Sequence, residues 1–170
     1  MQKRETLYAN VQLKAVKYMN RMQVVVSACL VGECCKWSGG SNTNEELVRL
    51  LHERGLSVVP VCPEVAGGLA VPREPAELLA NGRVATRSGA DVTESFELGA
   101  EACMNKLDEA GCCPWCTVCV LQPKSPSCGK GFVYDGTFSG NLIRGDGLFV
   151  QRLKRAGYSV LTPEEFIALH

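Results

Sequence analysis

Four short apolar runs alternate with polar and amphipathic segments along the chain. Each run is dominated by small or branched apolar residues and has no charged residue, which is typical of strands buried on both faces of a sheet. The runs that we predict to be strands are residues 23–29, 56–62, 117–121 and 158–161.

The segments between the runs carry apolar residues at helical spacing together with start and stop signals. Asn44 precedes two glutamates, and Thr162 precedes Pro and two glutamates, the pattern of a capping box with proline at the first helical position. Thr93 is predicted to cap the longest helix, and residues 83–86 and 91–93 to form a small hairpin or turn. The predicted helices are residues 45–51, a short one near 76–79, 93 to about 110, 146–155 and one from 163.

This alternation predicts an α/β fold with three layers, in which a parallel, Rossmann-like sheet carries helices on both faces. The first two runs flank one helix, so we expect them to be parallel neighbours. We predict a single domain over residues 23–170, preceded by an N-terminal extension, residues 1–22. The extension is expected to be an accessory helix or a loose tail rather than a targeting signal, and Met22 is a candidate alternative start.

The overall composition excludes several classes of protein. The 170 residues include 18 basic and 18 acidic side chains, and a net charge of zero argues against a general nucleic-acid binder and favours a small-molecule ligand. Hydrophobic residues make up 46% of the chain, which is enough for a buried core. No apolar run approaches the ~20 residues that span a bilayer, and residues 1–22 lack the apolar centre of a secretory signal. We therefore expect a cytoplasmic protein with no membrane contact.

Ten cysteines are the informative feature of the composition. Cytosolic proteins rarely keep structural disulfides, so these residues indicate metal, cluster or thiol chemistry. Cys29 and Cys62 end the first two predicted strands, and Cys128 lies in a Gly- and Ser-rich loop, residues 122–145, after the third. Because functional sites of parallel sheets lie at the carboxyl ends of the strands, we expect the three thiols to converge there. The alternative for each is a small buried apolar residue.

Three thiolates without histidine suit soft metals and iron–sulfur clusters, whereas structural zinc normally takes four ligands. A cluster held by three thiolates leaves one iron open to a substrate atom. An open, soft Lewis acid favours sulfur over a carbonyl oxygen.

Four motifs resemble those of the thiouracil desulfidase family: SACLVG, CPEVAGGLAVPREPAE, KSPSCGKG and YDGTFSGNLIRGDG. The resemblance covers about residues 22–166. It implies a 4Fe–4S cluster held by Cys29, Cys62 and Cys128, and removal of sulfur from a thiolated pyrimidine such as 2-thiouracil, with release of sulfide and no net electron transfer. It also implies that Glu64 is an acid–base residue and that Ser125 is catalytic. A cluster further implies contact with the iron–sulfur assembly machinery.

The residues themselves support two of these roles. Glu64 follows Cys62 after a proline and is expected to face the same cavity, where a carboxylate can move protons or activate water. A surface position or a salt bridge to Arg73 or Lys124 is the alternative. Ser125 can donate its hydroxyl proton to a substrate, or it can be a simple turn residue before a proline.

The glycine-rich segment 134–140 either walls the pocket with an aromatic ring against a planar base or is a turn with one buried Phe. Arg73 and Glu74 are weaker candidates for orienting a ligand. Of the remaining cysteines, Cys34 and Cys35 are expected near the pocket, exposed or lining it.

A second group of cysteines stands at the amino end of the third strand. Cys113 and Cys116 form a CxxC that can be redox-active or half of a zinc site. With Cys112 and Cys119, the group also matches spacings of ferredoxins and of radical enzymes. We favour a structural pair, or cysteines that have simply drifted into the sequence in a reducing cell, over a second catalytic centre, because this end of the strand lies opposite the other three thiols. The alternative function for the whole protein is therefore a CxxC thiol-redox protein or a zinc or iron–sulfur binding module. Cys103 is expected in the core.

Overall fold

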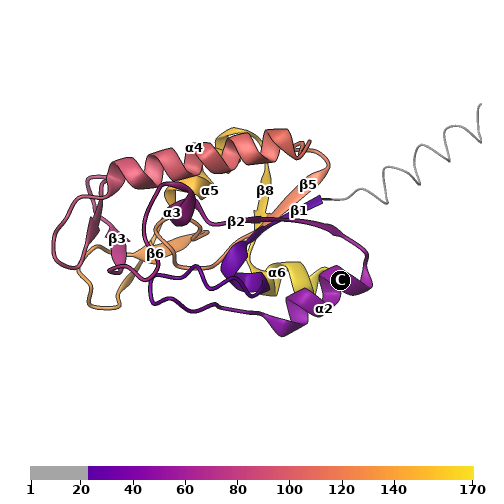
Figure 1. Cartoon of the computed structure of the whole chain (residues 1–170), viewed down its shortest axis with the longest axis horizontal. Helices are drawn as coiled ribbons and strands as arrows, with labels where there is room; N and C mark the ends of the chain where they lie inside the picture. Colours follow the sequence, from indigo (N-terminus) through magenta and orange to yellow (C-terminus); the bar gives the residue numbers. More distant parts are fainter. Residues whose placement is uncertain (1–22) are drawn as a thin grey trace, which may run out of the picture.

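The computed structural model describes residues 23–170, and its centre is a parallel sheet of four strands in the order β2-β1-β5-β8 (Figure 1). The strands are β1 Gln23–Ser27, β2 Ser57–Val61, β5 Thr117–Val120 and β8 Ser159–Leu161. All four predicted strands are confirmed, and β1 and β2 are parallel neighbours. The predictions for residues 1–22 lie outside the described residues, and the domain boundary stays a prediction.

Helices cover both faces of the sheet, which confirms the predicted three layers. One face carries α4 (Thr93–Glu109) and α5 (Leu148–Arg155), and the other carries α2 (Glu45–Glu53) and α6 (Pro163–Ala168) (Figure 1). Because side chains alternate along a strand, Val25 faces the first pair of helices and its neighbours face the second pair. Among the described residues, no helix is long and apolar enough to cross a membrane.

The helices that begin at residues 45, 93 and 163 start where they were predicted, and side chains cap the first and the last of them. The Asn44 side chain accepts a hydrogen bond from the backbone N–H of Leu47 (2.9 Å), and Thr162 forms a complete capping box with Glu165. The prediction that Thr93 caps α4 was wrong. Val92 is the N-cap residue, and the Thr93 hydroxyl oxygen instead accepts a hydrogen bond from the backbone N–H of Val84, 2.9 Å away.

The connections contain two small antiparallel sheets that the sequence did not predict correctly. The predicted short helix near residues 76–79 is wrong, because β3 (Ala76–Leu78) pairs with β4 (Val84–Thr86). Residues 83–86 and 91–93, which were predicted to form a small hairpin or turn, are joined by a single β-bridge between Ala85 and Asp91. The predicted loop 122–145 contains a hairpin of β6 and β7, and α5 begins at Leu148 rather than at residue 146. The hairpin strands are β6 Phe132–Tyr134 and β7 Leu142–Arg144.

Two short helical turns follow the strands that carry the predicted ligands. β1 ends at Ser27, and a 3-10 turn, η1 (Ala28–Val31), holds Cys29. β2 ends at Val61, and Cys62 is the N-cap residue of α3 (Pro63–Ala66). Both cysteines therefore lie just beyond the strands rather than inside them.

Candidate active site

A cavity of ≈ 590 Å³ opens at the carboxyl ends of β1, β2 and β5. The chain places β2 on one side of β1 and then crosses to place β5 on the other. Such a change of direction leaves a crevice at the carboxyl ends of the strands, and this is where ligands bind in open α/β sheets. The cavity thus lies where the strand order requires a binding site.

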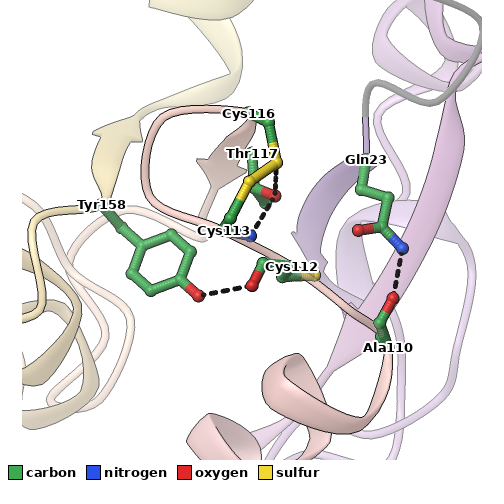
Figure 2. Close-up of a disulfide and its surroundings, with 7 residues drawn as sticks. All are labelled: Gln23, Ala110, Cys112, Cys113, Cys116, Thr117 and Tyr158. Atoms are coloured by element: carbon green, nitrogen blue, oxygen red, sulfur yellow. Dashed lines mark hydrogen bonds between the residues drawn. A yellow bond between two sulfur atoms is a disulfide. The ribbon is translucent and has the colours of Figure 1, made fainter. Parts of the chain in front are cut away.

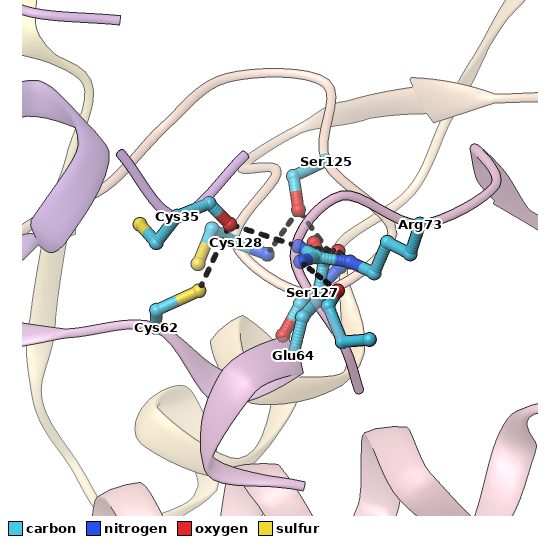
Figure 3. A network of polar contacts seen from close by, with 8 residues as sticks. Cys35, Cys62, Glu64, Arg73, Ser125, Ser127 and Cys128 are labelled. Atoms are coloured by element: carbon cyan, nitrogen blue, oxygen red, sulfur yellow. Dashed lines mark hydrogen bonds and ion pairs between the residues drawn. The ribbon is translucent and has the colours of Figure 1, made fainter. Parts of the chain in front are cut away.

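All five predicted site residues line this one cavity. They come from η1, from α3 and its N-cap, and from the loop after β5, and they are Cys29, Cys62, Glu64, Ser125 and Cys128. Figure 3 shows the thiols of Cys62 and Cys128 on one side and Glu64, Arg73 and Ser125 beside them. Segments distant in sequence therefore meet as predicted.

Cys29 and Cys128 are buried, Cys62 is half-buried, and the three groups act on one another electrostatically. Burial, together with the negative charges of Cys62 and Glu64, raises the pKa of Cys29 to about 11. Burial also raises the pKa of Cys128 well above its ordinary value, and Glu64, Cys62 and Cys29 act in the same direction. The thiolate forms of Cys29 and Cys128 are therefore stable only beside a positively charged group that offsets their negative charges.

Among residues 23–170, no three His, Cys, Asp or Glu side chains are gathered closely enough to hold a single metal ion. A cluster makes a different demand, because each thiolate binds a different iron and the sulfur atoms stand further apart than around one ion. Three thiols around one cavity, two of them buried and that of Cys62 half-buried, fit the donor chemistry of such a cluster.

Glu64 makes the ion pair that the sequence offered as one alternative. Arg73 donates from Nε (2.9 Å) and Nη2 (2.5 Å) to Oε2 of Glu64, and both side chains are largely buried. Nη2 of Arg73 also donates to the carbonyl oxygen of Cys35 (3.1 Å), which lies 3.9 Å from Sγ of Cys62. Arg73 therefore joins the carboxylate to the segments that carry two of the cavity cysteines.

Ser125 organises the loop that carries Cys128. Its Oγ accepts hydrogen bonds from the backbone N–H groups of Ser127 and Cys128, both at 3.1 Å. A hydroxyl that accepts two bonds keeps its own proton free to donate. The turn role and a donor role toward the cavity are therefore compatible.

The glycine-rich segment 134–140 does wall the cavity, as one of the two interpretations predicted. Tyr134 and Phe138 line it, and Arg87 lies over the Phe138 ring at 5.8 Å. Phe138 has φ of 57°, a left-handed conformation that costs energy in a residue other than glycine. Oε2 of the buried Glu77 holds it there by accepting from the N–H groups of Gly136 and Phe138, both at 3.0 Å.

Glu77 is the residue that sequence reasoning missed. It belongs to a quoted motif, but no role was assigned to it, and its buried position depends on the β3–β4 pairing that was predicted wrongly. The signal in the sequence was an acidic residue between two apolar neighbours, Ala76 and Leu78. Gln122, whose Oε1 lies 4.0 Å from Sγ of Cys29, was also missed.

The other cysteines lie at the cavity, at the surface, in the core and at the amino end of β5. Cys35 is buried and lines the cavity, whereas Cys34 is exposed and does not. Cys103 lies in the core, as predicted. Cys113 and Cys116 lie at the amino end of β5, away from the cavity, and are joined by a disulfide (Figure 2).

Comparisons with known proteins agree with this geometry. The family model of 2-thiouracil desulfurase matches residues 24–165. The chain is 38% identical over 151 residues to the uncharacterized protein YbbK of Bacillus subtilis (strain 168), covering 84% of this chain and 96% of YbbK. The solved structure of the 4Fe–4S-dependent thiouracil desulfidase TudS is similar with a TM-score of 0.75 and 36% identity, covering 88% of this chain and 98% of TudS. This chain is therefore a member of the 2-thiouracil desulfurase family.

Proposed function

We propose that the protein converts a thiolated pyrimidine such as 2-thiouracil to the oxo base and sulfide, without net electron transfer, at a 4Fe–4S cluster. The observation that carries the proposal is that the five predicted residues line one cavity at the carboxyl ends of the strands. Membership of the desulfurase family and the similarity to TudS support the reaction class.

Cys29, Cys62 and Cys128 are the proposed cluster ligands. They line the cavity from η1, from the N-cap of α3 and from the loop after β5, whereas Cys35, the fourth cysteine at the cavity, follows η1 in the same segment as Cys29. When bound through three thiolates, such a cluster supplies an open, soft Lewis acid that can accept the sulfur of the substrate. Burial raises the pKa of the Cys29 and Cys128 thiols, so loading the cluster releases protons from these two groups.

Glu64 is the proposed base for the attacking water and the proton donor to the ring. Both bonds from Arg73 end on Oε2, and no group within residues 23–170 donates to Oε1. Arg73 therefore orients the carboxylate while leaving one oxygen for water or a ring N–H. General acid–base catalysis of this kind contributes about 10²–10⁴-fold.

Ser125 is the proposed hydrogen-bond donor to the substrate. The two backbone bonds that it accepts fix the position of its oxygen, so the hydroxyl proton can be directed into the cavity. Phe138 and Tyr134 supply apolar walls suited to a planar base, and Glu77 holds the segment that carries them. We place the protein in the cytoplasm, where reducing conditions preserve its free thiols and the iron–sulfur assembly machinery can load the cluster.

Anaerobic reconstitution tests this function. The full chain is loaded with iron and sulfide and incubated with 2-thiouracil, and iron, released sulfide and uracil are measured. We expect about four irons per chain and one sulfide for each uracil. Cys62→Ser should lose the cluster, whereas Cys34→Ser, which changes an exposed cysteine outside the cavity, should keep both iron and turnover.

Other outcomes would contradict the proposal. Bound zinc without iron would identify a binding module. Loaded protein that leaves 2-thiouracil unchanged would remove the proposed reaction, and a cluster that survives Cys62→Ser would remove the proposed ligand set.

A further inference from the structure

The loop that enters β5 carries a cysteine pair that the desulfidase reaction does not use. Cys113 and Cys116 are joined by a disulfide, with their Cα atoms 5.4 Å apart (Figure 2). The loop joins the amino end of β5, whereas the cavity lies at the carboxyl ends of the parallel strands. A reaction at this pair is therefore spatially separate from the cavity.

The backbone around the pair is anchored independently of the disulfide. Nε2 of Gln23 donates to the carbonyl oxygen of Ala110 (2.7 Å), and the Tyr158 hydroxyl donates to that of Cys112 (3.3 Å). The turn itself is closed by a bond from the N–H of Cys116 to the carbonyl oxygen of Cys113 (3.0 Å). These bonds do not involve sulfur, so the pair can be reduced and reoxidised while the loop keeps its shape.

A buried threonine distinguishes the two sulfur atoms. The hydroxyl oxygen of Thr117 accepts a bond from the N–H of Cys113 (3.1 Å) and lies 3.8 Å from Sγ of Cys116. Because that oxygen already accepts, its proton is free to point toward the sulfur of Cys116. A hydrogen-bond donor beside a sulfur stabilises its thiolate, which makes Cys116 the better leaving group in thiol–disulfide exchange.

Cys113 and Cys116 are partly exposed, whereas the neighbouring thiols of Cys112 and Cys119 are buried. Trp115, between the two cysteines, is 88% exposed and offers an aromatic contact directly beside the disulfide. Cys112 and Cys119 are buried, and burial raises the pKa of Cys119 to about 12 and that of Cys112 above its ordinary value. Both remain protonated at neutral pH, so exchange is confined to the partly exposed pair, Cys113 and Cys116.

We propose that Cys113 and Cys116 form a redox-active dithiol–disulfide couple that exchanges with a dithiol protein of the thioredoxin type. A thiolate of the partner attacks Sγ of Cys113, and the electron pair of the broken S–S bond leaves on Sγ of Cys116 beside Thr117. The second thiol of the partner then attacks the partner's first sulfur in the mixed disulfide, and Cys113 leaves as a thiolate. Two electrons pass to this chain, both cysteines take up protons, and the partner becomes a disulfide.

A redox titration of the full chain tests the couple. The protein is equilibrated anaerobically in mixtures of reduced and oxidised dithiothreitol, quenched with acid, alkylated, and analysed by peptide mass spectrometry. We expect the two cysteines to change together as a two-electron couple, while the exposed single thiol of Cys34 stays open to alkylation throughout. A pair that remains oxidised in excess reduced dithiothreitol while the protein is folded, or that never oxidises, overturns the proposal.

Trapping tests the assigned order of attack. When a reduced thioredoxin that lacks its second cysteine is mixed with the oxidised, unchanged chain, its thiolate opens the disulfide and stays attached, and peptide mass spectrometry should find it on Cys113 roughly ten-fold more often than on Cys116. Thr117→Val should slow reduction about ten-fold, and Thr117→Ser should restore the rate. Equal trapping on the two cysteines, or no trapped mixed disulfide, overturns the assignment.

The desulfidase proposal fails or survives independently of this one. The double variant Cys113→Ser/Cys116→Ser should keep the iron content and the rate of sulfide release of the unchanged chain. Loss of either would show that the pair serves the cavity and would overturn its assignment as a separate site.

Discussion

Individual side chains at the cavity serve structure and chemistry together. The sequence offered Glu64 either as a catalytic residue or as a partner of Arg73, and the structure contains the ion pair. Ser125 was offered either as a donor or as a turn residue, and it makes the turn. In both cases one atom or proton remains available after the structural bonds are made, so the structural role does not exclude the catalytic one.

The role of Glu64 can be separated from cluster binding. Glu64→Gln keeps the shape and the acceptor oxygen but removes the base, so we expect full iron content and a loss of turnover of about 100-fold or more. The measurements are iron content, the visible spectrum and the rate of sulfide release. Glu74→Gln, which changes an exposed carboxylate outside the cavity, is the matched control and should keep its rate. Unchanged turnover in Glu64→Gln would refute the assignment.

The buried thiols away from the cavity make stability depend on pH. Burial raises the pKa of Cys119 from 9.0 to about 12, so the folded chain holds a proton there that the unfolded chain loses above pH 9.0. Stability from this group is therefore complete below pH 9.0 and is lost as the pH rises toward about 12, by about 1.4 kcal/mol per pH unit.

Urea unfolding of the cluster-free protein across this range measures the effect. Cys119→Ala should be less stable near neutral pH, because it leaves a small cavity, but its free energy of unfolding should fall less steeply between pH 9 and pH 12. Parallel pH profiles for the variant and the unchanged chain would show that the thiol contributes nothing to the pH dependence.

At the scale of elements, a close helix contact positions two site residues. A side chain at Gly99 of α4 would collide with the carbonyl oxygen of Pro63, and one at Gly67 would collide with that of Ser95. The absence of side chains lets α3 lie directly against α4. Because Cys62 is the N-cap residue of α3 and Glu64 lies in its first turn, this contact sets where both groups enter the cavity.

Gly99→Ala should therefore disturb the site from a distance. Over-packing of this kind costs about 1–3 kcal/mol, and we expect a lower urea midpoint together with reduced iron content after reconstitution. Ala102→Ser, on the exposed side of the same helix, is the control and should change neither. Full iron loading in Gly99→Ala would mean that α3 positions Cys62 without this contact.

The elements differ in how well the sequence predicted them. The four parallel strands, the helix start after Asn44 and the Thr162 capping box were predicted correctly, because apolar runs and capping residues act locally. Residues 76–78 were predicted as a helix and form β3, because their pairing with β4 supplies backbone bonds that local preference does not reveal. Threonine is a common capping residue, but the Thr93 hydroxyl donates to the carboxylate of Asp91 and accepts from the backbone N–H of Val84 instead of capping the helix.

At the scale of the whole molecule, the strand order makes the cavity and the cavity couples cluster binding to folding. Residues that lie far apart in the chain share the site only when β1, β2 and β5 are assembled. A group that binds only the folded state raises the free energy of unfolding, as metal centres commonly do.

Reconstituted protein should therefore resist urea better than the cluster-free chain, by about 3 kcal/mol or more under anaerobic conditions. In Cys62→Ser the two preparations should unfold at the same urea concentration, because the variant cannot hold the cluster. An equal midpoint for loaded and cluster-free forms of the unchanged chain would argue against a cluster bound by three elements of the fold.

The sequence by itself determined the fold class and the four strands, because apolar patterning is written along the chain, and its motifs supplied the five candidate residues that are found at the cavity. Only the tertiary structure decided that these residues line one cavity, that Arg73 engages Glu64, and that Glu77 holds the Phe138 segment. The physical reason is that each of these contacts joins elements separated in the sequence. Their geometry follows from sheet order, helix packing and backbone pairing rather than from local preference.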